Sequence, residues 1–224
     1  MVGSDTDRDR RAAVHAALGD PHRLQIVDAL AWSDHTPGEL RDLTGLPSNL
    51  LAFHLEVLEG AGVVERHASQ GDGRRRYVRL LDGPAADHAV PTEVPPATAV
   101  LFVCTHNSAR SQLAAAAWHA RTGHPASSAG TDPAPAVHPL AVRAGRDQGL
   151  DLRSATPTSW SDLDGHPDLV VSVCDRARES ALPPGVAHVH WSIPDPADGV
   201  ADDFDAVTVD IIRRVDRLAR QVAA

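Results

Sequence analysis

The side chains best suited to chemistry in this chain lie between Cys104 and Ser111. Five residues separate Cys104 from Arg110, and an apolar run comes directly before them. A short loop that turns back on itself can aim backbone N–H groups at one tetrahedral oxyanion, and a helix that begins after the loop adds its positive N-terminal end. Arg110 can bind two oxygens of the same anion. The spacing therefore predicts an oxyanion-binding loop that consists of Thr105, His106, Asn107, Ser108, Ala109, Arg110 and Ser111.

The same electropositive loop favours a negatively charged sulfur, so we expect Cys104 to act as a thiolate nucleophile. Cys174 is the second of the two cysteines in the sequence. Two cysteines cannot build a disulfide framework, and in a reducing compartment they are better explained by chemistry than by cross-linking. The nucleophile and the anion site are thus predicted to form one structure.

Strands and helices in the second half must hold this loop in place. Val100–Val103 is expected to form a buried strand, and an Ala-rich helix should run from Arg110 to about Thr122. Another apolar strand, Leu169–Val173, ends just before Cys174. This alternation predicts an α/β domain. A final helix should cover one face of the sheet with Phe204, Val207, Ile211, Val215, Leu218 and Val222.

Several stretches of the second half resemble the low-molecular-weight protein tyrosine phosphatase fold and, within it, the arsenate reductases of that fold. In chain order they are VLFVCTHNSARSQLA, SAGT, HPLAVRAGRDQGLDL, DLVVSVCDRARE and HWSIPDPA. The resemblance implies a four-stranded parallel sheet of the low-molecular-weight phosphatase type. It also implies that Asp195 is the general acid for the leaving oxygen, and that Asn107 and Ser111 brace the loop and hydrogen-bond the sulfur.

Two substrates compete for such a site, a phosphotyrosine-like ester and inorganic arsenate. A phosphotyrosine ring needs an aromatic or apolar wall. Here Asp195 is followed by Pro196–Gly199, which has no aromatic residue, and the only tyrosine, Tyr77, lies in the first half. A small inorganic oxyanion fits better, while Trp160 and Trp191 keep the phosphotyrosine alternative open.

Arsenate reduction needs a second thiol besides Cys104. Cys174 resembles the first resolving cysteine of thioredoxin-coupled relatives, whose third cysteine corresponds to Ala181 here. A relay through two internal resolving thiols is therefore excluded. Either an external thioredoxin-like reductant opens a Cys104–Cys174 disulfide, or a low-molecular-weight thiol attacks the adduct directly. A buried, inert Cys174 is the competing interpretation, and we expect no bound cofactor.

The first half has the pattern of a helix-turn-helix followed by a β-hairpin wing. A helix around Leu24, Val27 and Leu30 precedes a second helix at Pro37–Thr44. After the turn at Gly45, Ser48 is expected to be the N-cap of a helix with Leu51, Leu55 and Leu58 on its inner face. Two strands, Val63–His67 and Arg75–Leu80, should then form the wing around a turn at residues 70–73. Arginines cluster on this hairpin at Arg66, Arg74, Arg75, Arg76 and Arg79.

This half resembles the ArsR family of winged-helix repressors over about Arg10 to Leu81. The matching stretches are LGDPHRLQIVDAL, GELRDLTGLPSNLLAFHLEVLEGAGVV and RRRYVRL. The resemblance implies a homodimer that binds double-stranded DNA with Ser48–Gly60 in the major groove. Base-facing residues would be Ser48, Asn49, Ala52 and Phe53, and phosphate-facing residues Arg74, Arg75 and Arg76. The family's metalloid sensors bind As(III) through cysteines, but no cysteine precedes Cys104. The histidines of this half lack the spacing of a ligand set, so we expect no metal site.

Composition and charge limit the possible functions. The formal net charge is −9, so any DNA contact must come from a local basic patch. No apolar run approaches the roughly 18 residues that a membrane span needs, and residues 1–11 are polar rather than signal-like, so we expect a cytoplasmic protein with no membrane contact. We expect a disordered segment at 1–9, a winged helix-turn-helix domain at 10–81, a linker at 82–98 with four prolines, and an arsenate reductase-like domain at 99–224.

The leading hypothesis is an arsenate reductase fused to an ArsR-type DNA-binding transcriptional regulator. Two alternatives stay open. One is a low-molecular-weight protein tyrosine phosphatase tethered to a winged helix, and the other is a DNA-binding regulator whose loop only senses an oxyanion or the redox state.

Overall fold

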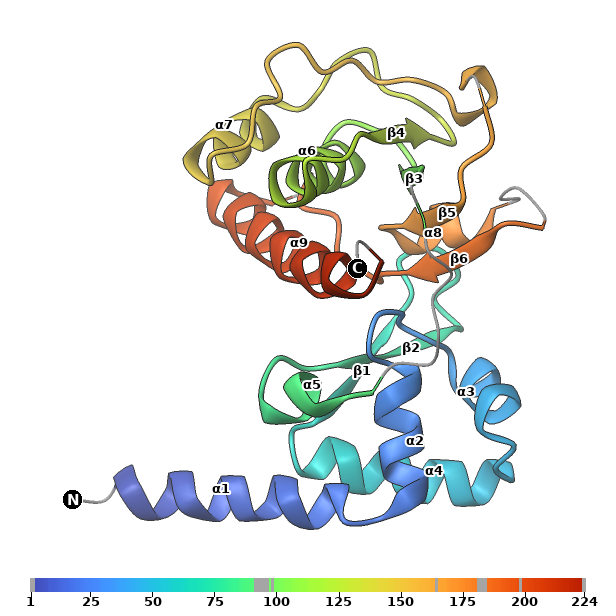
Figure 1. Ribbon diagram of the computed structural model, residues 1–224, viewed down its shortest axis with the longest axis vertical. Helices are drawn as coiled ribbons and strands as arrows, with labels where there is room; N and C mark the ends of the chain where they lie inside the picture. Colours follow the sequence, from blue (N-terminus) through green and yellow to red (C-terminus); the bar gives the residue numbers. More distant parts are fainter. Residues whose placement is uncertain are drawn as a thin grey trace. The chain divides into compact units, whose positions relative to one another are not determined.

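The computed structural model describes residues 3–90, 97, 99–163, 165–180, 185–197 and 199–222. The chain divides into two compact units. The first contains helices α1 to α5 and the strands β1 and β2, and the second contains all elements from β3 to α9 (Figure 1). Ala181, the position expected to replace a third cysteine, lies outside the described residues.

The first unit is mainly helical with one antiparallel hairpin, which confirms the predicted winged helix-turn-helix fold. Leu80 pairs with Val64 at the open end of the hairpin, and Arg76 pairs with Ala68 near its turn. The elements are α1 (Gly3–Leu18), α2 (Pro21–Ala29), α3 (Pro37–Thr44), α4 (Ser48–Gly60), β1 (Val64–Ala68), β2 (Arg76–Leu80) and α5 (Pro84–His88).

Local signals set most helix ends in this unit. The Asp20 side chain accepts hydrogen bonds from two backbone N–H groups at the start of α2. Thr36 and Glu39 form a capping box that begins α3, and Gly45 ends it in the left-handed conformation with φ 70°. The prediction that Ser48 is the N-cap of α4 is wrong. Pro47 takes that position, because its backbone is non-helical with ψ 144° and its carbonyl oxygen already accepts a hydrogen bond from the N–H of Leu51 at 2.9 Å.

The core of the first unit lies between α2, α3, α4 and the hairpin. Leu51, Leu55 and Leu58 are buried on the inner face of α4, as the spacing predicts. Leu24, predicted on the same helix face as Val27 and Leu30, is instead 43% exposed. The buried face of α2 is centred between Val27, Leu30 and Ile26, and at about 100° per residue Leu24 lies well away from that direction.

Two segments expected to lack structure are partly helical. Helix α1 begins at Gly3, so residues 3–9 continue the helix that packs through Val14, Ala17 and Leu18. The acidic residues Asp5, Asp7 and Asp9 lie near the N-terminus of this helix, where its dipole favours negative charge. Helix α5 falls within the predicted linker and buries Ala85 in the core of the first unit. The exact domain boundaries remain predictions.

The second unit is an α/β structure around a four-stranded parallel sheet in the order β4-β3-β5-β6, as predicted (Figure 1). Helix α6 packs against α9 and against β3 and β4. Its elements are β3 (Val100–Cys104), α6 (Arg110–Thr122), β4 (Ala126–Gly130), α7 (Pro139–Asp147), the 3-10 helix η1 (Trp160–Asp162), β5 (Leu169–Ser172), α8 (Asp175–Glu179), β6 (Ala187–His190) and α9 (Ala201–Val222).

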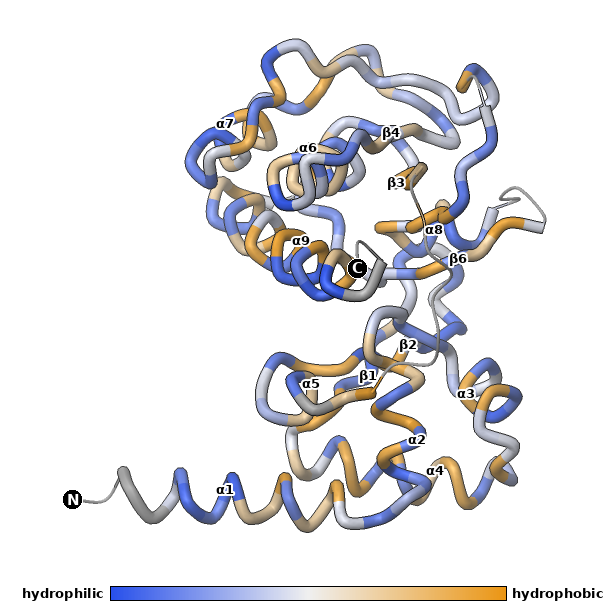
Figure 2. The backbone as a smooth tube through the Cα atoms, in the orientation of Figure 1, coloured by the Kyte–Doolittle hydropathy of each residue, from blue (hydrophilic) through white to orange (hydrophobic). Residues whose placement is uncertain are grey.

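Central strands of a parallel sheet are buried on both faces and so are continuously apolar. Every residue of β3 and β5 is buried, and Figure 2 shows the hydrophobic colour of these strands. Helix α9 buries Phe204, Val207, Ile211, Val215 and Leu218, and the side chain of Val222 lies outside the described ones. Within the described residues, no helix is long and apolar enough to cross a membrane.

Replacing Leu58 by alanine should destabilise the first unit by about 2–5 kcal/mol, because its fully buried side chain would leave a cavity between α4 and the hairpin. Hydrogen exchange of protected amides in α2 and α4 would measure this loss. Leu43→Ala is the matched control, since Leu43 is 57% exposed and should cost less than about 0.5 kcal/mol. Equal effects of the two substitutions would contradict the assigned core.

Candidate functional site

The loop between β3 and α6 is held by hydrogen bonds to its backbone carbonyl groups. The carbonyl oxygens of Cys104, Thr105, His106 and Ser108 accept hydrogen bonds of 2.8–3.2 Å from the backbone N–H groups of Thr131, Asp132, Ala134 and His138, respectively. A peptide group that turns its oxygen outward turns its N–H the opposite way. The loop N–H groups are therefore available on its inner side, as an anion-binding loop requires.

Gly130, at the end of β4, allows this close approach. A Cβ atom at position 130 would lie 2.7 Å from the carbonyl oxygen of Thr105 and 3.1 Å from Cβ of Asn107. Asn107 itself has φ 47°, a left-handed conformation that asparagine tolerates better than most residues. Glycine in β4 and asparagine in the loop thus fit the tight turn around Cys104.

The Cys104 sulfur is buried and receives hydrogen bonds from inside the loop. The backbone N–H of Asn107 donates to Sγ at 3.1 Å, and the Ser111 hydroxyl lies 3.0 Å from Sγ. Asn107 Nδ2 donates to the Ser111 oxygen at 2.8 Å, while Asn107 Oδ1 accepts from Gln112 and from the N–H of Thr158. This chain of contacts fixes the donors that face the sulfur.

Arg110 and Asp195 meet although 85 residues separate them. The buried Arg110 guanidinium donates to the backbone oxygen of Ile193 at 2.8 Å and forms an ion pair with the Asp195 carboxylate. The structure therefore brings a carboxyl group and the loop arginine together at the carboxyl end of the sheet, which is where ligands bind in open parallel sheets.

Cys174 belongs to the same site. It follows β5 as the N-cap of α8, and its Sγ lies 3.4 Å from the hydroxyl of Thr105, the neighbour of Cys104. Both cysteines are free thiols. Burial raises the pKa of the Cys174 thiol and the nearby Cys104 sulfur adds to this, whereas the charge of Arg110 and the Thr105 hydroxyl act against it.

The two tryptophans that could contact a phosphotyrosine ring, Trp160 and Trp191, differ in their exposure. Trp191 is 1% exposed and packs against Phe102 inside the unit, so it cannot form the wall of an open site. Trp160 begins η1 and is half-buried. Of the two, only Trp160 has surface that a ligand ring could meet.

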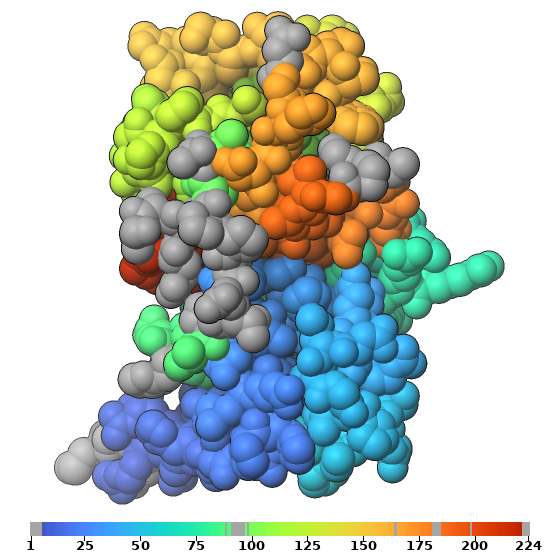
Figure 3. Space-filling model, turned by 45° about the vertical axis from the view of Figure 1, so that its right-hand side comes forward, coloured from blue at the N-terminus to red at the C-terminus, as the bar shows by residue number. Residues whose placement is uncertain are grey.

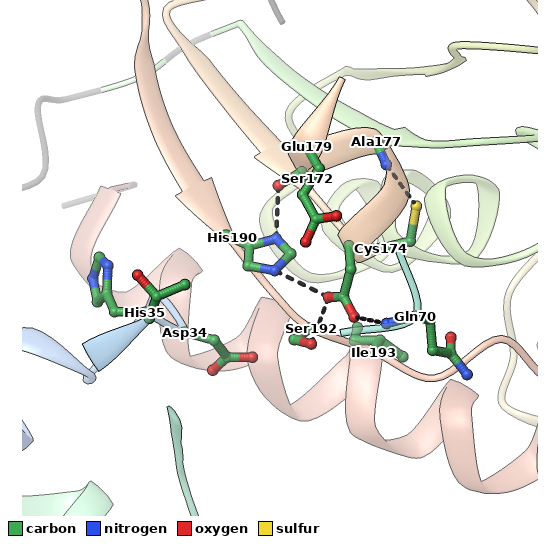
Figure 4. Close-up of polar contacts among 12 residues, drawn as sticks. Asp34, His35, Gln70, Ser172, Cys174, Ala177, Glu179, His190, Ser192 and Ile193 are labelled. Carbon is green, nitrogen blue, oxygen red and sulfur yellow. Dashed lines mark hydrogen bonds and ion pairs between the residues drawn. The ribbon is translucent and has the colours of Figure 1, made fainter. Parts of the chain in front are cut away.

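A second buried polar group was missed by reasoning from the sequence. Ser172, Asp175, His190 and Ser192 come from β5, α8, β6 and the segment after β6, and all four are buried (Figure 4). Burial opposes ionisation of Asp175, but hydrogen bonds from His190 and Ser192 hold the pKa of its carboxyl below the ordinary value. These residues have no recognisable spacing, since only strand pairing brings them together.

The candidate DNA interface lies in the first unit. Ser48, Asn49, Ala52 and Phe53 are all exposed on α4, with Phe53 at 54%. Residues 74–76 of the hairpin are also exposed, and Figure 3 shows hairpin side chains, in teal, projecting from the surface.

Two other arginines of the predicted wing are already paired within the unit. Arg66 forms an ion pair with Glu59 of α4, and Arg79 pairs with Glu65. The hydrogen bond between Arg66 and Glu59 raises the pKa of the guanidinium and lowers that of the carboxyl. Part of the positive charge of the predicted wing is therefore neutralised within the unit.

The sequence was compared with known protein families and proteins. The model of the low molecular weight phosphotyrosine protein phosphatase family matches residues 99–224, and a helix-turn-helix domain model matches residues 18–67. An arsenate reductase of Brevibacillus brevis is 36% identical over 125 residues, which cover 54% of this chain and 92% of that protein. An arsenate reductase of Bacillus cereus is 33% identical over 126 residues, with coverage of 54% and 92%.

A solved structure shares the fold of the second unit. The tyrosine phosphatase Wzb of Escherichia coli K30, crystallised with sulphate, has a TM-score of 0.52 and 21% identity, and the match covers 56% of this chain and 99% of that one. The sheet and the cysteine loop thus define an α/β protein of the phosphatase fold. The chain belongs to the low molecular weight phosphotyrosine protein phosphatase family through residues 99–224, and it carries a helix-turn-helix domain in addition.

Within the described residues, no group of three or more His, Cys, Asp or Glu side chains is arranged to hold a metal ion. The polar groups gathered at the loop are instead N–H donors, two thiols, a guanidinium and a carboxylate. Such a set has the composition of an oxyanion site with a nucleophile.

Gly130→Ala should weaken the binding of inorganic phosphate at least tenfold, about 1.4 kcal/mol, because the added methyl group would push the Thr105 carbonyl out of place. Isothermal titration calorimetry with phosphate would measure this loss. Ser127→Ala, at an exposed position of the same strand, is the control and should leave binding within about twofold. Unchanged binding in the Gly130 variant would show that the loop does not form the anion site.

Proposed function

We propose that this chain reduces arsenate to arsenite at Cys104 and that its helix-turn-helix unit binds double-stranded DNA as a regulator. The observation that carries the enzymatic part is the placement of Cys104 and Cys174 around one oxyanion loop. An oxyanion site beside two free thiols holds both the nucleophile and a second source of electrons. The relatives named arsenate reductases support this choice of substrate.

In the first step the Cys104 thiolate attacks the arsenic atom of bound arsenate. An As–S bond forms and one As–O bond breaks, and the departing oxygen takes protons to leave as water. Arg110 and the loop N–H groups hold the remaining oxygens. Asp195, which the ion pair places beside Arg110, is the proposed proton donor to the leaving oxygen. The arsenic is still As(V) in this adduct.

Reduction requires a second thiol to attack the adduct at sulfur. If Cys174 attacks Cys104 Sγ, a disulfide forms, the As–S electron pair stays on arsenic, and arsenite leaves as As(III). Two thiols lose two electrons, and arsenic gains them. An external thioredoxin-like protein would then reopen the disulfide. In the alternative route, a low-molecular-weight thiol attacks the same sulfur and forms a mixed disulfide.

The surroundings of the loop favour a small anion over a phosphotyrosine ring. Trp191 is buried in the core, and the described residues that follow Asp195 are Pro196, Ala197 and Gly199, which offer no aromatic wall. Phosphatase activity is the second candidate, because the half-buried Trp160 has surface that a phosphotyrosine ring could contact. Thiol chemistry of this kind requires reducing surroundings, so we place the protein in the cytoplasm.

For the first unit we propose DNA binding by a homodimer. The exposed face of α4 would enter the major groove, where Ala52 and Phe53 suit the methyl groups of thymine. Arg74, Arg75 and Arg76 would lie against phosphates. The link between the two units would let one chain both bind an operator and remove an arsenic oxyanion.

Cys104→Ser should abolish arsenite formation, because serine supplies no thiolate. Cys174→Ser should lower turnover with a thioredoxin-type reductant at least about 100-fold, since no internal disulfide can form. Arsenite release, measured by liquid chromatography with mass detection, reports both effects. Full activity of the Cys174 variant with a low-molecular-weight thiol would select the direct route. Hydrolysis of para-nitrophenyl phosphate without any arsenite would refute the proposal in favour of a phosphatase.

Arg75→Ala and Arg76→Ala should each weaken binding to duplex DNA and lower the slope of log Kd against log salt by about one, since each removes one phosphate contact. Fluorescence anisotropy on a duplex selected from a random library would measure the slope. Arg79→Ala is the control because Arg79 is half-buried and pairs with Glu65, whereas residues 75 and 76 are exposed. An equal change of slope in all three variants would contradict the assigned interface.

A further inference from the structure

The buried polar group beside the site forms one continuous chain of contacts. His190 Nδ1 lies 2.9 Å from the Ser172 hydroxyl, and His190 Nε2 lies 3.2 Å from Asp175 Oδ1. The Ser192 hydroxyl donates to the same Asp175 oxygen at 2.5 Å. His188 Nε2 lies 3.0 Å from the Ser172 oxygen at the other end. Figure 4 shows His190 between Ser172 and the carboxylate that Ser192 also approaches.

A serine, a histidine and an aspartate in this order have the composition of a hydrolytic triad, but this group cannot act as one. Ser172 is fully buried, and His190 is only 2% exposed. A substrate carbonyl has no access to either side chain. Burying polar groups costs free energy unless they find polar partners. The group is therefore better explained by a structural role than by a catalytic one.

The protons can be assigned so that every close contact has one donor. Nε2 of His190 faces the Asp175 carboxylate in an ion-pair contact of 3.2 Å, the Ser172 hydroxyl donates to His190 Nδ1, and His188 donates to the Ser172 oxygen. This assignment follows from matching donors to acceptors. This series of side-chain contacts connects Asp175, at the start of α8, with β5 and β6.

Asp175 is the residue directly after Cys174, and the backbone between them is extended. Cys174 has φ −158° and ψ 151°. In extended backbone, successive side chains point to opposite sides. When Asp175 points toward His190, Cys174 must point the other way, and there its Sγ meets Thr105 and the N–H of Ala177.

We propose that the Asp175–His190 pair is a positioning device that holds the Cys174 thiol toward Cys104 for disulfide formation. The inference rests on the proposed role of Cys174 as the second thiol of the reductase. Asp175 and His190 touch neither the oxyanion nor either sulfur, so they act through the backbone of Cys174. Weakening the pair frees the first turn of α8 and lets the thiol leave the loop.

The experiment uses hydrogen peroxide in place of arsenate, so that it does not depend on the proposed substrate. Peroxide oxidises the Cys104 thiolate to a sulfenic acid and releases hydroxide. Cys174 then attacks that sulfur, a disulfide forms, and water leaves. Rapid acid quenching, alkylation of free thiols and mass spectrometry of the full chain give the rate of disulfide formation. Alkylation of Cys104 by iodoacetamide, measured separately, reports the state of the loop.

Asp175→Asn should slow disulfide formation at least tenfold, while alkylation of Cys104 stays within twofold of the unsubstituted protein. Ser192→Ala removes one hydrogen bond to Asp175 and should slow the step about threefold, which provides a milder variant if the first does not fold. His190→Gln keeps an N–H donor at the same place, so the rate of disulfide formation in this variant should stay close to that of the unsubstituted protein. Asp216→Asn is the control, because Asp216 pairs with Arg121 on α6.

Normal disulfide formation in both Asp175→Asn and Ser192→Ala would overturn the inference, and so would a parallel loss of Cys104 alkylation, which would mean general damage to the loop. A chain that forms no Cys104–Cys174 disulfide at all would overturn it as well, even if arsenite were still produced with a low-molecular-weight thiol. Arsenite production is measured separately, so failure of the reductase proposal can be told apart from failure of the positioning role.

Discussion

The second unit depends on how the backbone of one loop satisfies its hydrogen bonds. Four carbonyl oxygens between Cys104 and Ser108 bond outward to the segment 131–138. Buried carbonyl groups need partners, and here the partners come from the far side of the loop. The N–H groups are consequently turned inward, toward Cys104. The oxyanion site that we propose depends on this single arrangement of the backbone.

Other features of the site serve that arrangement. Gly130 gives the loop room, and Asn107 accepts the left-handed conformation while its side chain bonds to Ser111, Gln112 and Thr158. The parallel sheet then delivers Cys174 from the neighbouring strand to Thr105. Because both strands end at the same edge, two thiols far apart in the sequence lie at one loop, near the charge of Arg110.

Charge in the first unit is arranged differently. Helix α4 contains Glu56 and Glu59 but no arginine, and Glu59 binds the nearby Arg66. The arginines at residues 74–76 are exposed and lie outside that helix. Recognition by α4 would rely on shape and apolar contact with bases, and the hairpin would supply the attraction to phosphate.

The sequence alone determined features that depend on local order along the chain. The spacing from Cys104 to Arg110, the apolar strand before it and the periodic leucines of α4 each follow from a few neighbouring residues, and the predicted fold classes of both units are confirmed. Only the tertiary structure decided which residues meet across long separations: that Arg110 binds Asp195, that Trp191 is buried, and that Ser172, Asp175, His190 and Ser192 form one chain. Such contacts depend on strand order and register, and no short stretch of sequence records these.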